Sequence, residues 1–270
     1  MVLQLELRAA SPPIDLEGVV PDALHGRSLA EIERLPLRCG NREVPLAELF
    51  AVRGVADDTL ELLGDLTHVR NLGAKLTAGR IIVRGTAGDG VGRKMRGGEI
   101  LVEGNAGDGL GSEMRGGTIR VRGSAGDGVG GAERGGSRGM TRGTIVVEGS
   151  AGRQVGAGMR RGLIAIGGNA GEFAGYRLLA GTIVVLGAAG ANYGAEMKRG
   201  TLALLGSVAP PLPTFRCACT AQPAIIPLLF RHLRELNFAA ENAFETQPLE
   251  IWNGDLLTGG RGEVWRRVSA

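Results

Sequence analysis

The sequence is poor in cysteine and aromatic residues and has no long apolar run. Its three cysteines, Cys39, Cys217 and Cys219, are an odd number, which argues against a disulfide framework. No stretch of about 18 consecutive apolar residues occurs, so we expect no membrane-spanning helix. The N-terminus carries an early acidic residue and no apolar core, so we expect no signal peptide and a cytoplasmic protein.

The charge of the chain is also too weak to identify a partner. A formal net charge of +3 over 270 residues does not by itself indicate nucleic acid binding. Lysine occurs only as Lys75, Lys94 and Lys198, so nearly all basic residues are arginine, a bias typical of GC-rich bacterial genes. The hydrophobic content of 43% is enough for a packed core, which argues against disorder.

Glycine is the abundant residue, and it recurs at a fixed interval. The chain has 47 glycines, but they follow no triplet period, which excludes collagen. Taking Gly79 as the start of a unit, the next glycine follows after 19 residues in every step except one of 26. The equivalent residues are Gly98, Gly117, Gly143, Gly162, Gly181 and Gly200. Each unit reads approximately G-x-I-x-V-x-G-x-A-G-D-x-V-G-x-x-M.

Alternating apolar residues after each of these glycines predict a short strand in every unit. Pairs such as Ile81 and Val83 recur two residues apart, and the residue between them varies, Arg120 being one example. We therefore expect one buried face, with further inward ladders of alanine, medium-sized aliphatic residues and methionine. Met140 is expected to fill the methionine position inside the 26-residue unit.

The unit length predicts the fold. Nineteen residues are too few for a strand, a full helix and two connections, but they suit one coil of two or three short strands. We predict a mainly β protein, a right-handed parallel β-helix (solenoid) over residues 60–206, whose first coil, 60–78, is degenerate. Residues 1–59 and 207–270 are expected to form small α/β caps. The expected helices lie at residues 28–35, 46–50 and 225–236, and the tail at 249–265 is expected to form strands and a turn.

Three kinds of motif are candidates for chemistry. The glycine-rich repeat lacks a phosphate-binding loop and has no helix where a dinucleotide fingerprint requires one. Asp89, Asp108 and Asp127 repeat in consecutive units and predict side chains that accept backbone N–H bonds, rather than a calcium site. Cys217 and Cys219 have no second cysteine pair nearby, so we predict no zinc site.

Basic residues gather at the end of each unit and in the long unit. One column contains Arg96, Arg115, Arg160 and Lys198, and the next contains Arg142, Arg161 and Arg199. The insertion leaves the stack between Gly130 and Gly143 and contains Arg134, Arg138 and also Arg142. Stacked like charges repel, so either water or an acidic partner must screen them. A solvated corner and a binding surface both remain open.

The repeated units, the segment RGMTRGTIVVEG and the tail NGDLLTGGRGEVW resemble the family of the formylmethanofuran dehydrogenase C subunit. The resemblance covers most of the chain. Within this family, the chain is most similar to the C subunit of the bacterial formyltransferase/hydrolase complex. The repeats alone are less specific, since the C-terminal domain of the glutamate synthase large subunit has a similar solenoid.

The resemblance implies a non-catalytic scaffold in one-carbon metabolism. Such a complex passes the formyl group of formyl-tetrahydromethanopterin to a methanofuran-type carrier and hydrolyses it to formate, a late step of formaldehyde oxidation in methylotrophy. The formyltransferase, the hydrolase-like subunit and a further subunit are the implied partners, with no nucleic acid or membrane. No cofactor, metal or catalytic residue is assigned to this chain.

The carrier bears an acidic oligoglutamate tail, which the basic residues are expected to contact unless they contact an acidic subunit instead. The candidate residues are Arg96, Arg115, Arg134, Arg138, Arg142, Arg160, Arg161, Lys198 and Arg199. Two other identities remain open: the C subunit of an archaeal-type tungsten or molybdenum enzyme, and a structural β-helix domain of the glutamate synthase type. A secreted polysaccharide-degrading β-helix is disfavoured by the expected lack of a signal peptide.

Overall fold

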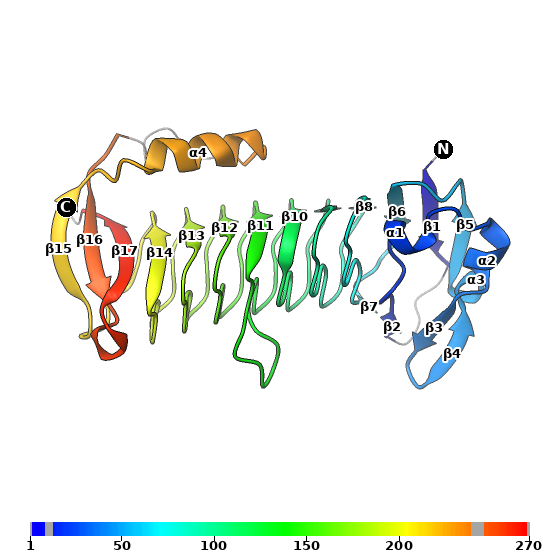
Figure 1. Cartoon of the computed structure of the whole chain (residues 1–270), viewed down its shortest axis with the longest axis horizontal. Helices are drawn as coiled ribbons and strands as arrows, with labels where there is room; N and C mark the ends of the chain where they lie inside the picture. Colours follow the sequence, from blue (N-terminus) through cyan, green and yellow to red (C-terminus); the bar gives the residue numbers. More distant parts are fainter. Residues whose placement is uncertain (1, 9–12, 239–245, 269–270) are drawn as a thin grey trace.

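One large, mainly parallel sheet dominates the computed structural model, which describes residues 2–8, 13–238 and 246–268 (Figure 1). The molecule is mainly β, as predicted. The sheet has 13 strands, and from β6 to β14 its neighbours follow sequence order. These central strands are β6 (Thr59–Leu63), β8 (Arg80–Val83), β9 (Glu99–Val102), β10 (Arg115–Val121), β11 (Arg142–Val147), β12 (Leu163–Ile166), β13 (Thr182–Val185) and β14 (Arg199–Leu204).

The repeat sets the register of these strands. Ile81 pairs with Ile100, and Ile100 pairs with Ile119, so like residues stack in parallel along the sheet. The degenerate first unit follows the same register, because Leu60 pairs with Ile81. Alternate side chains of each strand point into the same core, where Ile81 is fully buried.

Each unit contributes one strand and a single further bridge, not the two or three strands expected. The bridges form a second parallel ladder through the small alanine of each unit. Its members are Leu66, Ala87, Ala106, Ala125, Ala151, Ala170, Ala189 and Val208. The backbone between strand and bridge runs through glycine-rich turns, which give too few consecutive extended residues for a second strand.

Glycine at the start of each unit has a steric cause. Gly98 has a φ of 77°, and a Cβ there would lie 2.5 Å from the carbonyl oxygen of Gly79. The methionine ladder packs beneath the same turns. A Cβ on Gly162 would meet the Met140 methyl at 2.7 Å, as one on Gly117 would meet Met95 at 2.6 Å. Met140 is fully buried, so it fills the predicted position in the long unit.

The N-terminal segments extend the sheet at one end. Strand β1 (Leu3–Leu7) pairs with β6 in parallel and with β5 (Phe50–Arg53) in antiparallel orientation. A second sheet contains β2 (Ile14–Asp15), β3 (Pro36–Cys39), β4 (Arg42–Pro45) and β7 (Val69–Arg70). The helices are α1 (Pro21–Leu24), α2 (Leu29–Glu33) and α3 (Leu46–Leu49). Two of these helices, α2 and α3, lie where the sequence predicts helices.

The C-terminal segment continues the stack. Strand β17 (Arg261–Arg267) pairs with β14 in parallel, and β16 (Leu249–Gly254) and β15 (Arg216–Ala221) follow in antiparallel order. A short 3₁₀ turn, Leu256–Thr258, joins β16 to β17. The sequence predicts strands and a turn here, but it does not predict that β17 takes the next place in the repeat register.

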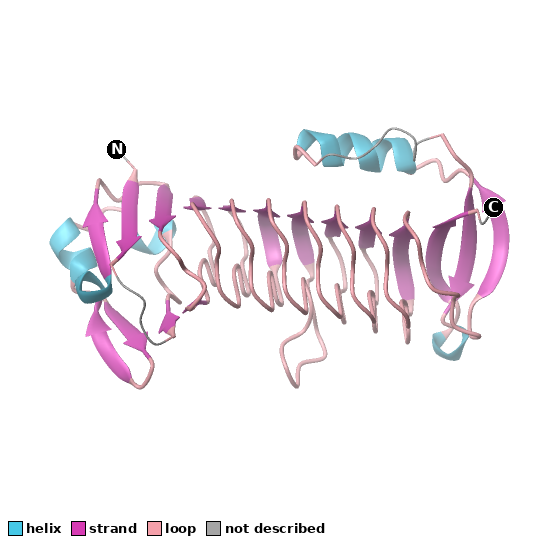
Figure 2. Ribbon diagram, turned by 180° about the vertical axis from the view of Figure 1, so that it is seen from behind, coloured by secondary structure: helices cyan, strands magenta, loops and turns pink. Residues whose placement is uncertain are grey.

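Helix α4 (Ile226–Glu235) lies along the stack on the outer side of the sheet (Figures 1 and 2). Its buried residues pack against outward side chains of β11 to β14 and of the C-terminal strands. This second core contains Val146, Leu163, Ala165, Val184, Ala203, Leu205, Ile226, Phe230, Leu233, Phe238, Leu249 and Trp265. The expectation of one buried face is therefore wrong for β11 to β14, where the helix buries the second face.

Candidate partner surface

The turn before each strand carries the predicted basic residues, and stacking of the units brings these turns into one edge of the molecule. We call Arg96, Arg115, Arg142, Arg160, Arg161, Lys198 and Arg199 the basic row. Arg142 is the first residue of β11 and pairs in the ladder with Arg115. Arg142 therefore lies in the stack, and its expected place in the inserted loop is wrong. It also pairs with Arg115 of the other predicted column, and the ladder shifts register between this pair and Thr118.

The inserted loop, residues 131–139, projects from the stack on the side opposite α4 (Figure 1). Arg134 and Arg138 are exposed on it. Glu133 anchors its base. The Arg93 Nη2 atom donates to Glu133 Oε2 at 2.9 Å, Arg93 Nε also donates to this carboxylate, and Lys94 Nζ lies 3.3 Å away. The Arg93 bond holds the pKa of Glu133 below its ordinary value, and the carboxylate raises the pKa of Arg93.

None of the nine predicted cations forms an ion pair or side-chain hydrogen bond with a residue that the structure describes. Other arginines of the stack are paired: Arg84 contacts Glu61 at 2.5 Å and Glu103 at 2.8 Å. The Nε atom of Arg160 is buried without a hydrogen-bond partner among the described atoms. A buried donor of this kind is unfavourable until something pairs with it.

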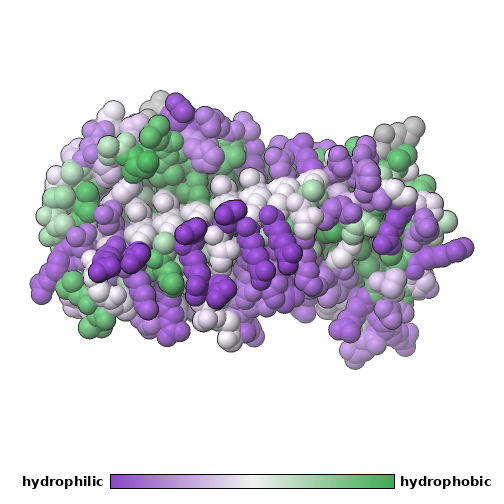
Figure 3. Space-filling view, in the orientation of Figure 1, coloured by the Kyte–Doolittle hydropathy of each residue, from purple (hydrophilic) through white to green (hydrophobic). Residues whose placement is uncertain are grey.

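From Arg115 onward the row also lacks acidic residues in its turns, whereas Glu99 follows the corner glycine of the Arg96 unit. In the five units from Arg115 to Thr201, the two residues before the corner glycine, the glycine itself and the residue after it include no Asp or Glu. Leu179 and Ala180 interrupt the charges in one unit. Figure 3 shows hydrophilic side chains in rows across the lower half of the stack. The potential along this edge is therefore positive and suits an anionic partner.

The repeated aspartates act as predicted. Asp89 Oδ1 accepts the backbone N–H of Asp108 at 3.0 Å, and Asp108 Oδ1 accepts that of Asp127 at 2.8 Å. Asp127 Oδ1 accepts the N–H of Arg153 at 2.7 Å. Each carboxylate thus ties its unit to the next. A groove of about 570 Å³ lies between this corner and the inserted loop.

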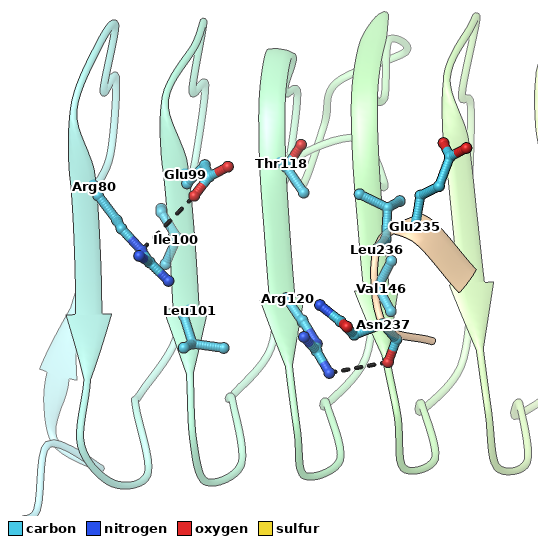
Figure 4. A pocket seen from close by; sticks show the side chains of 10 residues that line it. All are labelled: Arg80, Glu99, Ile100, Leu101, Thr118, Arg120, Val146, Glu235, Leu236 and Asn237. Carbon is cyan, nitrogen blue, oxygen red and sulfur yellow. Dashed lines mark hydrogen bonds and ion pairs between the residues drawn. The ribbon is translucent and has the colours of Figure 1, made fainter. Parts of the chain in front are cut away.

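A smaller pocket of about 190 Å³ lies where the end of α4 meets β8 to β11 (Figure 4). Its charged residues are occupied within the chain. Arg80 lies 3.7 Å from Glu99, and Arg120 donates to the carbonyl oxygen of Asn237 at 3.0 Å. Leu101 contributes apolar surface. The pocket thus offers little unpaired charge to a ligand.

The cysteines and histidines do not converge. Cys217 and Cys219 are exposed on β15, opposite the consecutive residues Trp252 and Ile251, so they fall on different faces of the strand. In the described ranges, the group with metal-ligand spacing is His25, Asp57 and Asp58, which is exposed. No described helix is both long and apolar enough to cross a membrane.

Sequence reasoning missed three residues at the end of the basic row. Arg261 pairs with Arg199 in the ladder and adds a cation to the edge. Leu256 and Leu257 form an exposed tip on the turn before it. The dipeptide Arg-Gly at 261–262 repeats the one at 199–200, which is the signal that could have placed β17 in register.

Comparison with solved structures gives a match over nearly the whole chain. A chain of the crystal structure of the formyltransferase/hydrolase complex from Methylorubrum extorquens in complex with methylofuran is 37% identical, with a TM-score of 0.92. The match covers 98% of this chain and 100% of that chain. A scan against protein-family models gives no match.

Curated relatives match over a shorter part. The C subunit of the tungsten-containing formylmethanofuran dehydrogenase 2 of Methanothermobacter wolfeii is 38% identical over 78 residues, 27% of this chain and 29% of the relative. The C subunit of the molybdenum-containing enzyme 1 of Methanosarcina barkeri is 37% identical over 92 residues, 32% and 31% respectively. The chain thus spans less than a third of these relatives' length in the aligned region.

Proposed function

Because the chain belongs to the family of the formylmethanofuran dehydrogenase C subunit, we propose that it is the scaffold subunit of a formyltransferase/hydrolase complex. The observation that carries this proposal is the similarity to a chain of the Methylorubrum extorquens complex over 98% of the sequence. The match includes the N- and C-terminal segments, which a likeness of repeats alone would not include.

The proposed complex takes formyl-tetrahydromethanopterin, passes its formyl group through a methanofuran-type carrier and releases formate in the cytoplasm. Its partners are the formyltransferase, the hydrolase-like subunit and a further subunit. The presence of methylofuran in the similar complex supports a carrier of this kind at the level of the assembly. We assign the chemistry to the other subunits, and to this chain the assembly of the complex.

The architecture suited to this role is a right-handed parallel β-helix over residues 60–206, related to that of the glutamate synthase domain, between caps at 1–59 and 207–270. Parallel pairing of consecutive units and the second ladder of alanine bridges support it. A rod of stacked units presents long, regular edges, which suit simultaneous contact with several subunits.

The nine predicted cations are the proposed contact for an acidic oligoglutamate tail of the carrier or for an acidic subunit. Their lack of ion pairs within the described chain supports this role. Replacing Arg96, Arg115 and Arg160 together by Gln should lower either carrier content or recovery of the assembled complex. Unchanged carrier content together with unchanged assembly would refute it.

Purification of the native protein tests the main proposal. The chain, tagged in its own host, should co-purify with larger subunits, and that assembly should convert formyl-tetrahydromethanopterin to formate. The isolated chain should be inactive. Recovery of the native chain alone, without partner subunits, would count against a scaffold role.

The archaeal relatives favour one alternative, the C subunit of a tungsten- or molybdenum-dependent formylmethanofuran dehydrogenase. Metal analysis of the purified assembly separates the two. The hydrolytic complex should contain no stoichiometric tungsten or molybdenum, whereas the dehydrogenase should contain one of them in another subunit.

A further inference from the structure

A solvent-exposed leucine lies on a tightly held turn at the end of the basic row. Leu257 has 82% of its surface exposed, and the neighbouring Leu256 has 48%. The turn is fixed by Asp255, which is only 3% exposed. Its Oδ1 atom accepts the N–H of Leu257 at 3.0 Å, and its Oδ2 atom accepts the N–H of Glu196 at 3.1 Å. This hydrogen-bonded turn holds the leucine side chain in water. Because the turn is already rigid, little conformational entropy is lost when the leucine binds a partner.

The same turn is bonded to the residue beside the basic row. Met197 offers its carbonyl oxygen to the N–H of Asp255 at 3.3 Å and to the Thr258 hydroxyl at 2.5 Å. Lys198 follows directly in the chain. Arg261, after the turn, pairs with Arg199. The leucine tip therefore lies beside the cations of the last units. Figure 1 shows the turn between β16 and β17 on the side of the stack from which the inserted loop also projects.

We infer that this edge is a protein-docking surface, with the basic row facing an acidic face of a partner subunit and Leu257 entering an apolar pocket of it. This docking surface rests on the proposed role in a multi-subunit complex, and it is the part of the chain that would contact the partner subunit. A polyanionic tail would use the cations but has no use for an exposed leucine. A protein interface commonly combines a few buried apolar anchors with surrounding charge complementarity.

Leu228 provides a matched control, because it is 55% exposed and belongs to α4, the helix that Figure 1 shows on the side of the stack opposite the inserted loop. For the charges, Arg53, Arg153 and Arg231 are side chains of 71%, 67% and 70% exposure outside the row. Both control sets change exposed residues of the same types, and these residues lie outside the proposed docking surface.

The test uses the chain, tagged in its own host, and counts partner subunits by native mass spectrometry. Two variants test the surface: the single variant Leu257→Asp and the triple variant Arg115→Glu, Arg142→Glu and Arg199→Glu. Each should lower the amount of partner subunit associated with the tagged chain at least tenfold. Leu228→Asp and the control triple to Glu should leave it within twofold. Thermal melting of each isolated variant verifies its fold, and Leu257→Ala serves as a milder variant.

The outcomes separate the inference from the proposed function. If the wild-type chain brings no partner subunits, both fail. If it does, and the test variants retain them as the controls do, the docking surface is refuted while the scaffold role stands. Intact assembly with loss of carrier from the charge variant alone would also overturn it, in favour of a polyanion site.

Discussion

At the scale of single residues, Glu133 determines how the inserted loop is held. Its carboxylate is a hydrogen-bonded partner of Arg93 and Lys94, and all three side chains are about 70% buried. Partial burial makes this contact stronger than an exposed ion pair. The pH dependence follows from the lowered pKa of Glu133. The stabilisation is fully present above the ordinary value of 4.5 and is lost as the pH falls through the lower pKa of the folded state.

Glu133→Gln should therefore loosen the loop and lower the free energy of unfolding by about 1 kcal/mol at pH 7. The difference from the wild type should shrink as the pH falls below 4.5 and through the lower pKa of the folded state. Limited proteolysis at 134–138 and denaturant melts at pH 7 and pH 3.5 measure both effects. Glu172→Gln, whose carboxylate lies 3.7 Å from an exposed Arg153, is the control and should change neither.

Asp108 distinguishes a structural role from a metal role for the repeated aspartates. Asp108→Ala removes the acceptor for the Asp127 N–H and should destabilise the protein by about 1 kcal/mol. Asp108→Asn keeps an oxygen acceptor and should retain most of the stability. Melting curves with and without calcium complete the test. A calcium-induced rise in melting temperature that Asp108→Asn abolishes would contradict the structural role.

At the scale of elements, the sequence predicts the main strand of each unit well, because that strand depends on a local pattern, but it overestimates the number of strands in a unit. The period of 19 residues fixes which residues pair, and Ile81, Ile100 and Ile119 stack as expected. The cover of α4 over the sheet depends on contacts between segments far apart in the chain, which periodicity does not specify. A signal was nevertheless present, since Val146 and Val184 are apolar at outward positions.

The packing of α4 can be tested through Phe230, which is 1% exposed against the outer face of the sheet. Phe230→Ala should cost about 3–5 kcal/mol or detach the helix, because a large buried side chain is lost. Leu228→Ala on the same helix is the control and should cost less than about 0.5 kcal/mol. Denaturant melts and hydrogen exchange of α4 measure the two variants. Equal effects would show that α4 is not packed as described.

At the scale of the whole molecule, the basic surface is only partly predictable. The repeat indicates which cations share a column, but the 26-residue unit hides where its extra residues leave the strand. Arg142 consequently falls in the ladder beside Arg115. The contribution of Arg261 and Leu257 depends on β17 pairing with β14, a contact between segments about 60 residues apart.

The C-terminal segment both ends the stack and covers its outer face, so its removal should change the state of the whole molecule. A chain truncated after Gly206 exposes the free edge of β14 and the apolar outer residues Ala203 and Val184. An uncovered edge of this kind pairs with other chains. We expect the truncated chain to elute as large oligomers or to precipitate, whereas the full chain does not self-associate through this edge. Light scattering after size-exclusion chromatography measures the difference.

Adding Ala203→Lys and Leu205→Lys to the truncated chain should reduce the association, because charge on an exposed edge strand opposes pairing. A truncated chain that remains monomeric without these lysines would show that the C-terminal strands do not protect the stack.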